Sequence, residues 1–324
     1  MVIRHSLTAR IERSVAQTSG FIILFAFFLF GCSSASPSPT PAPVIEATLT
    51  PVPSATASPT AVPDYVTKIR NAQYQLGATD ALRLVQLTDG KFEQGTTGGT
   101  DFVSVNVTDF VASGDLNSDG VNEVAALIAE NYGGSGVFTF LAIYSEVNGA
   151  LVFQTAAYVD DRPGLNALAI ENDEVFLEVV IHTTEDPFCC PTLRIARHYR
   201  LLINNQLDIT DYTTFTPDGR PRTISIEKPV NGAETYSTVQ FKGRVAIAPF
   251  ENNLVYRIYD LGGVELAAGS IIVKAPELGG PGTFDSVITL GNILSGALIR
   301  VEIQDISAED GSLLAMDSVE LVVK

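Results

Sequence analysis

Short apolar and alternating runs recur along most of the chain, and they have the length and composition of β-strands. They are rich in β-branched and aromatic residues, which favour the extended backbone of a sheet. Four clear examples are residues 102–107, 137–144, 175–181 and 194–201. Turn-forming pairs separate the runs, at Asp89-Gly90, Asn148-Gly149, Asn204-Asn205, Asn231-Gly232, Gly262-Gly263 and Asp310-Gly311. Helical periodicity is confined to residues 65–74, so the pattern predicts an all-β protein.

The β pattern divides into two parts at a stretch that is typical of a linker. Residues 217–221, Pro-Asp-Gly-Arg-Pro, are turn formers that interrupt strands. The length available for folding, about 260 residues, is enough for two domains. We therefore expect two antiparallel β domains, residues 64–215 and residues 223–324, with their boundary within residues 213–222.

The N-terminus carries a short apolar run that ends in a cysteine. Arg4, Arg10 and Arg13 precede the run at residues 21–30, and Gly31 and Cys32 follow it. The run is too short to span a bilayer core about 30 Å thick. Its charge and length are typical of an export signal.

The four residues Leu29-Phe30-Gly31-Cys32 resemble the lipobox of bacterial lipoproteins. Phe30 departs from that motif, which usually has a small residue there. The resemblance implies a signal peptide of residues 1–31, a lipid on Cys32, and a lipid-anchored protein on the extracytoplasmic side of a cell membrane. The alternative is a plain secretory signal in which Cys32 is incidental.

Residues 32–63 form a low-complexity segment after the cysteine. It is rich in proline, serine, threonine and alanine, and Glu46 is its one charged residue. Such a composition cannot bury enough apolar surface to fold, so we expect a disordered linker. Its reach in a polyproline II conformation is roughly 95 Å.

The net charge of −17 excludes one class of partner. An acidic chain repels phosphates, and no basic stripe offsets this charge, so we expect no nucleic acid as a partner.

The strongest chemical motif is an acidic loop at residues 115–123. Asp115, Asn117, Asp119 and Glu123 occupy positions 1, 3, 5 and 9, and Val121 adds a backbone carbonyl at position 7. Gly120 at position 6 permits the tight turn that brings such oxygens onto one hard cation. The spacing predicts a structural Ca²⁺ site, and the alternative is an Asx-rich turn without metal.

The loop resembles the Asp-x-Asn-x-Asp-Gly calcium loops of dockerins, EF-hands and integrin-type propeller blades. It departs from an EF-hand because Ala126 stands at position 12. Residues 124–129 favour a buried strand at least as strongly as the exit helix of an EF-hand, so the resemblance is better to the strand-loop-strand form found in blades.

A second unusual motif is the adjacent pair Cys189 and Cys190. In an exported protein these two thiols are expected to oxidise, so a vicinal disulfide is one interpretation. Two others stay open: free thiols, or a metal site with His182 and His198.

Both predicted domains resemble domains of bacterial lipoproteins. Residues 64–212, with the acidic loop and the Cys-Cys-Pro turn, are similar to a domain of such proteins that has no assigned function. From Thr223 onward the chain resembles the immunoglobulin-like domain associated with bacterial spore-germination lipoproteins. That resemblance rests on residues 224–232, 239–245, 250–255, 282–285, 308–313 and 318–323. It implies an antiparallel β-sandwich.

Phe250 has two interpretations within this second domain. With Glu251 and two asparagines after it, Phe250 is either part of an exposed binding lip or, as the default, a core aromatic beside the start of a strand.

Catalytic motifs are absent from the sequence. There is no Gly-x-Ser-x-Gly elbow, phosphate-binding glycine loop, zinc helix motif or Ser-x-x-Lys. We therefore expect a non-catalytic protein that binds another envelope component, either a protein or a glycan. The alternatives are a structural spacer lipoprotein and a hydrolase with a site among the acidic loops.

Overall fold

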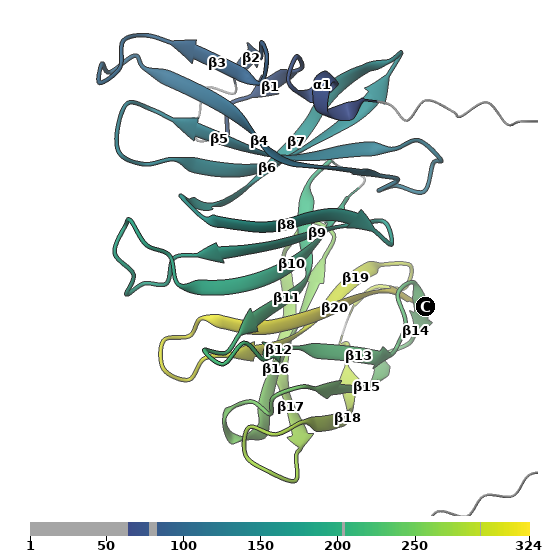
Figure 1. Cartoon of the computed structure of the whole chain (residues 1–324). Coiled ribbons are helices and arrows are strands. Elements are labelled where there is room, and N and C mark those ends of the chain that lie inside the picture. The colour runs from purple at the N-terminus through teal and green to yellow at the C-terminus, as the bar shows by residue number, and fades with distance from the viewer. Residues whose placement is uncertain (1–63, 78–82, 203–204, 292) are drawn as a thin grey trace, which may run out of the picture. The chain divides into compact units, whose positions relative to one another are not determined.

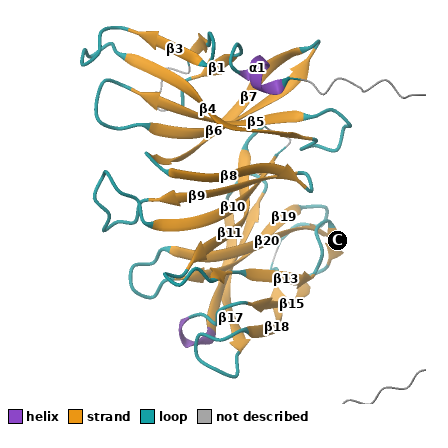
Figure 2. Ribbon diagram, in the orientation of Figure 1, coloured by secondary structure: helices purple, strands orange, loops and turns teal. Residues whose placement is uncertain are grey.

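The computed structural model describes residues 64–77, 83–202, 205–291 and 293–324 (Figure 1). The predicted signal peptide, the predicted linker and Cys32 lie outside these residues. All of the described residues belong to a single compact unit. They form strands almost throughout, which confirms the all-β prediction (Figure 2).

Among the described residues before position 216, the elements are one short helix and eleven strands. They are α1 (Tyr65–Ile69), β1 (Gln73–Gln75), β2 (Leu84–Gln86), β3 (Lys91–Gln94), β4 (Val103–Gly114), β5 (Glu123–Asn131), β6 (Phe138–Val147), β7 (Ala150–Asp161), β8 (Gly164–Glu171), β9 (Glu174–Ile181), β10 (Leu193–Leu201) and β11 (Leu207–Phe215).

From position 216 to the end, the part that the structure describes contains nine strands and one 3₁₀ turn. They are β12 (Pro221–Arg222), β13 (Ile224–Lys228), β14 (Ala233–Thr235), β15 (Thr238–Val245), η1 (Phe250–Asn252), β16 (Asn253–Asp260), β17 (Glu265–Lys274), β18 (Gly282–Thr289), β19 (Leu298–Ile306) and β20 (Leu313–Val323). The four runs singled out in the sequence fall in β4, β6, β9 and β10.

The helix is shorter than its sequence pattern predicts. The carboxylate of Asp64 caps α1 by accepting the Thr67 N–H at 3.0 Å, and the helix ends at Ile69. Tyr74, which the pattern includes in the helix, instead lies in β1. Its buried hydroxyl donates to Glu130 at 2.5 Å, a tertiary contact that local periodicity does not encode.

A five-stranded antiparallel sheet, in the order β3-β4-β5-β6-β7, forms the centre of the N-terminal half. The adjacent strands β5 and β6 are buried on both faces, which explains their continuous apolar runs. Side chains such as Ala126 and Tyr144 face a core shared with α1, β1 and β2. Leu127 and Ile143 face a second core shared with β9, β10 and β11. The buried strand predicted at residues 124–129 is therefore confirmed.

Local turn chemistry sets the connections of this sheet. Asn148 and Gly149 join β6 to β7 with φ of 52° and 83°, the pair of positive values that a two-residue hairpin turn requires.

A second sheet continues from the N-terminal half into the C-terminal half. Its strand order is β8-β9-β10-β11-β20-β19-β16-β17-β18-β15-β13, with β12 and β14 at its sides. The strands β11 and β20 pair antiparallel through Asp211–Asp317, Tyr212–Met316 and Thr213–Ala315. Backbone pairing therefore crosses the boundary that the sequence predicts.

The predicted linker is the tight turn of a hairpin. The N–H of Thr216 donates to the carbonyl of Arg220 at 2.9 Å, and Thr214 pairs with Arg222 across β11 and β12. Prolines and glycine end the strand here, but the chain reverses at once and does not form an extended tether.

The C-terminal half encloses one apolar core between its strands. The core takes alternate residues from β13 and β15 to β20, with Phe241, Leu254 and Val301 completely buried. Strands β16 and β17 form the hairpin expected around Gly262-Gly263, which confirms that element. The assignment of this half to an immunoglobulin-like family stays a prediction.

Carboxylates gather where β11 meets β20. Asp317 accepts the backbone N–H of Ile226 at 2.6 Å and lies across from Asp211, which contacts His198 at 3.6 Å. Burial raises the pKa of Asp317 to about 7, with the negative charges of Asp211 and Glu174 adding to this effect.

Replacing Asp317 by asparagine should make the stability of the protein less dependent on pH. The pKa of Asp317 exceeds the unfolded value of about 3.9, so its stabilising contribution is complete below pH 4 and is lost as pH rises through 7. The asparagine side chain would keep an acceptor oxygen but carry no charge. The free energy of unfolding of Asp317→Asn, measured relative to the wild type in urea, should be about 2 kcal/mol higher at pH 8 than at pH 5.

Asp218→Asn is the matched control, because Asp218 is an exposed carboxylate whose pKa is lowered by Thr216 and then Arg220. It should give no such gain at pH 8. An Asp317→Asn effect that is equal at both pH values would contradict the assignment.

Candidate functional site

The acidic loop joins β4 to β5 and folds around the side chain of Asp115. One carboxylate oxygen of Asp115 accepts the N–H groups of Asn117 and Asp119 at 3.2 and 3.3 Å, and the other accepts that of Gly120 at 2.8 Å. The Asn117 side chain accepts the N–H of Asp119 at 3.0 Å. The N–H groups that donate to Asp115 lower its pKa, and the N–H of Gly120 makes the largest contribution.

Glu123 closes the loop from the first residue of β5. It is 1% exposed, and its carboxylate accepts the N–H of Leu116 at 3.0 Å. Burial raises the pKa of Glu123, and the nearby charges of Asp119 and Asp115 raise it further. All five predicted ligands therefore lie on this one loop, and Asp115 and Asp119 are close enough to Glu123 to raise its pKa.

The donor set of this loop suits a hard cation, since it consists of carboxylate and amide oxygens with a backbone carbonyl at Val121. Asp119 accepts the N–H of Val121 at 2.7 Å, so several of these oxygens already hold loop N–H groups. Within the described ranges, no group of three or more His, Cys, Asp or Glu side chains has the arrangement of a formed metal site. The chemistry fits Ca²⁺, and the assignment remains a prediction.

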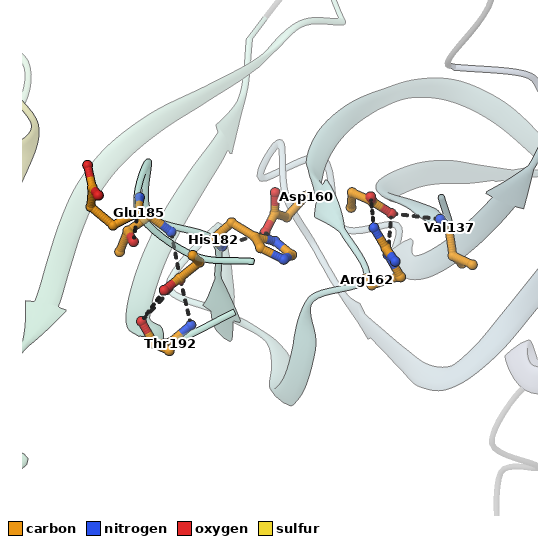
Figure 3. A network of polar contacts seen from close by, with 9 residues as sticks. Val137, Asp160, Arg162, His182, Glu185 and Thr192 are labelled. Carbon is orange, nitrogen blue, oxygen red and sulfur yellow. Dashed lines mark hydrogen bonds and ion pairs between the residues drawn. The ribbon is translucent and has the colours of Figure 1, made fainter. Parts of the chain in front are cut away.

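The cysteine pair lies at the tip of the loop between β9 and β10, and Cys189 and Cys190 are joined there by a disulfide. The carboxylate of Asp186 closes the base of this loop by accepting the N–H groups of Thr183 and Thr192, each at 2.9 Å (Figure 3). Phe188, beside the disulfide, is 83% exposed. The loop thus presents an apolar tip on a hydrogen-bonded base.

The two histidines of the alternative metal site are held by different carboxylates. Both the backbone N–H and the ring Nδ1 of His182 contact one oxygen of Asp160, at 2.7 and 2.9 Å, as Figure 3 shows. This contact raises the pKa of His182.

His198 lies opposite Phe176 in the β9–β10 pair, six positions along β9 from His182. At about 3.3 Å per residue this separates the two histidines by roughly 20 Å. The structure does not bring them together at one metal.

Asp161, next to Asp160, pairs with Arg162 at 2.6 Å and accepts the N–H of Val137 at 2.7 Å. Both aspartates lie at the end of β7 and have partners there, Asp160 in His182 and Asp161 in Arg162 and Val137.

A groove lies at one end of the C-terminal half, where three loops meet. It encloses about 910 Å³. Its walls come from the connection between β15 and β16, the β17–β18 loop and the β19–β20 loop, with Arg222 beside them. Loops at the end of a β framework are a common place for binding sites, because the strands hold them in fixed positions.

Two large apolar side chains on the groove are exposed. Phe250 is 68% exposed and Leu278 is 91% exposed. The default interpretation of Phe250 as a core aromatic is therefore wrong. In η1 the chain reverses through Glu251 and Asn252, with φ of 53° and 57°, so that Leu254 enters the core and Phe250 points outward.

The charged lining of the groove is mainly acidic. Asp305, which is almost fully buried, pairs with Arg222 at 3.1 Å, and burial raises the pKa of Asp305. Glu251 and Glu309 are exposed, and neither forms an ion pair with the residues that the structure describes.

The groove was only partly foreseeable from the sequence. The Phe250 lip was one open alternative, whereas the contribution of Leu278 was missed. Leu278 precedes Gly279-Gly280-Pro281, a turn-forming sequence, but a single leucine in a loop belongs to no periodic pattern that would identify it as a binding residue.

Comparison with known proteins gives no family for this chain, because no family model and no curated protein matches it. Among the described residues, no helix combines the length and the apolar character that a membrane span requires.

Proposed function

We propose that this protein is a lipid-anchored, extracytoplasmic binding protein that contacts another protein of the cell envelope through the groove of its C-terminal half. The observation that carries the proposal is the pair Phe250 and Leu278, two large apolar side chains held exposed on different loops of one groove. Single exposed apolar residues are common on a folded surface, but two on one groove form a shared apolar surface, and burial of such side chains is a main source of binding free energy.

The anchoring part of the proposal rests on the sequence of residues 1–32. Acylation of Cys32 would hold the protein at a membrane, and residues 32–63 would separate the folded part from that membrane. Two acyl chains give stable attachment, because one chain alone binds only marginally.

Calcium enters the proposal as a structural ion at the acidic loop. Asp115, Asn117, Asp119 and Glu123 would supply side-chain oxygens and Val121 a carbonyl oxygen. The cation would offset the repulsion that the charges of Asp115 and Asp119 exert on Glu123. No step of the binding function depends on it.

A glycan is the alternative ligand of the groove, and the exposed apolar side chains of Phe250 and Leu278 favour a protein partner over it. A structural spacer or a hydrolase also remains an alternative, although no particular contact favours either one.

Cys32→Ser should release the protein from the membrane. We expect the wild type to stay with the membrane fraction after a high-salt wash and the variant to appear in the soluble exported fraction. Mass spectrometry of the wild-type N-terminus should find fatty acid on Cys32. An unmodified Cys32, or a mature N-terminus elsewhere, would contradict the anchor.

Removal of calcium should lower the melting temperature of the purified protein. With a dissociation constant of about 10⁻⁴ to 10⁻³ M, a calcium concentration of about 2 mM stabilises the folded state by about 0.6 to 1.8 kcal/mol. This corresponds to a difference of about 1 to 7 °C between thermal melts with and without EDTA. Asp119→Asn should reduce that difference and Asp218→Asn should not. An EDTA melt equal to the calcium melt would remove the metal from the proposal.

Truncation of the groove side chains should abolish partner capture. A photo-crosslinker introduced at position 250 or 278 in native membranes should give a discrete adduct with an envelope protein. At position 287, where Val287 is 66% exposed on β18 outside the groove, it should give none. The double variant Phe250→Ala/Leu278→Ala should lower partner recovery at least tenfold in a pull-down, and Val287→Ala should leave it unchanged. Equal capture from positions 250 and 287 would refute the groove as the binding site.

A further inference from the structure

The charged groups of the groove indicate the chemistry of its partner. We infer that the groove binds a peptide segment in which a large apolar side chain is combined with lysine or arginine; this inference rests on the proposed binding function. The inference names the side chains that the bound segment of the partner carries, which the proposed binding function does not specify.

The requirement for an apolar side chain in the partner comes from Phe250 and Leu278, the two exposed apolar residues that we call the rim of the groove. Phe250 lies in the β15–β16 connection and Leu278 in the β17–β18 loop. The N–H of Ala248, in the first of these, donates to the carbonyl of Gly280, in the second, at 2.7 Å. The hydrogen bond ties these two loops together. An apolar side chain placed against both rim residues would bury surface that the free protein leaves in water.

The basic requirement comes from an excess of carboxylates. The charged residues that line the groove are three carboxylates, Asp305, Glu251 and Glu309, and one guanidinium, that of Arg222. Arg222 already pairs with Asp305, so Glu251 and Glu309 leave the groove with a negative charge. The net charge of −17 adds a long-range field of the same sign, which favours the approach of a cation and opposes an anion.

The groove is also built before any partner arrives. In the β19–β20 loop, the N–H of Ser307 donates to the carbonyl of Ser312 at 2.8 Å and the N–H of Gly311 to that of Ser307 at 3.0 Å. Glu251 and Asn252 hold positive φ values that ordinary side chains rarely adopt. A pre-organised site loses little conformational entropy on binding, so a short segment suffices as its partner.

A random twelve-residue peptide library selected on the purified full-length protein tests this inference. The selection is repeated on Phe250→Ala/Leu278→Ala, so that peptides bound elsewhere are recognised and discarded. Peptides that depend on the groove should carry a net positive charge and at least one large apolar residue. Enrichment of acidic or uncharged groove-dependent peptides would overturn the inference, and so would the absence of any groove-dependent peptide.

The best peptide is then measured by fluorescence anisotropy against two matched pairs of variants. Glu251→Gln/Glu309→Gln should weaken its binding at least fivefold. Glu93→Gln/Glu185→Gln, which removes two exposed carboxylates outside the groove, should weaken it less than 1.5-fold. Equal losses in the two pairs would mean non-specific attraction to an acidic protein and would overturn the inference.

The crosslinking experiment separates this inference from the function on which it rests. If position 250 captures a protein whose contacting segment is acidic or uncharged, the binding function stands and the partner chemistry is wrong. If position 250 captures a glycan, both the protein partner and the peptide chemistry fall. If it captures nothing, the function and the inference fall together.

Discussion

One strand, β20, belongs to both of the large cores that lie along the second sheet. Its residues Ala315, Val319 and Leu321 fill the core of the C-terminal half, whereas Met316 enters the core between the two sheets of the N-terminal half. The same strand pairs with β19 on one side and with β11 on the other. A strand sends alternate side chains to opposite faces, so β20 can supply both cores through an ordinary alternating sequence. The shared strand couples the packing of one half to that of the other.

The parts of the fold that depend on local pattern were predictable from the sequence. Runs with a period of two, and turn pairs such as Asn148-Gly149, fix strands and hairpins through contacts between near neighbours. The pairing of β11 with β20 could not be predicted, because residues such as Asp211 and Asp317 are far apart in the sequence and no local signal joins them. The helix was predicted too long for a similar reason, since the tertiary bond from Tyr74 to Glu130 outweighs helical spacing.

The candidate sites divide in the same way. The acidic loop is contiguous, so its residue types and spacing could be identified from residues 115–123 alone. The groove is assembled from three loops and the residues around Phe250, Leu278 and Glu309 meet only in the folded chain. The positive φ of Glu251, which turns Phe250 outward, has no sequence signal comparable to a glycine.

The strands around the groove explain how it can remain open. Val245, Val273 and Ile303, buried core residues near the ends of β15, β17 and β19, lie just before the three loops. Each loop therefore leaves the core from a fixed point. The exposed rim is supported by packing beneath it, which allows apolar residues to stay in water without collapsing into the groove.

The hairpin turn at residues 216–220 has a practical consequence for anyone who divides this protein. A C-terminal half expressed from residue 223 would lose β11 and leave the start of β20 as a bare sheet edge, with Met316 uncovered beside it. Such edges promote aggregation by adding strands from other molecules. A proteolytic nick in the turn would do no such harm, because the two fragments would still be joined by the strand pairing and the shared core.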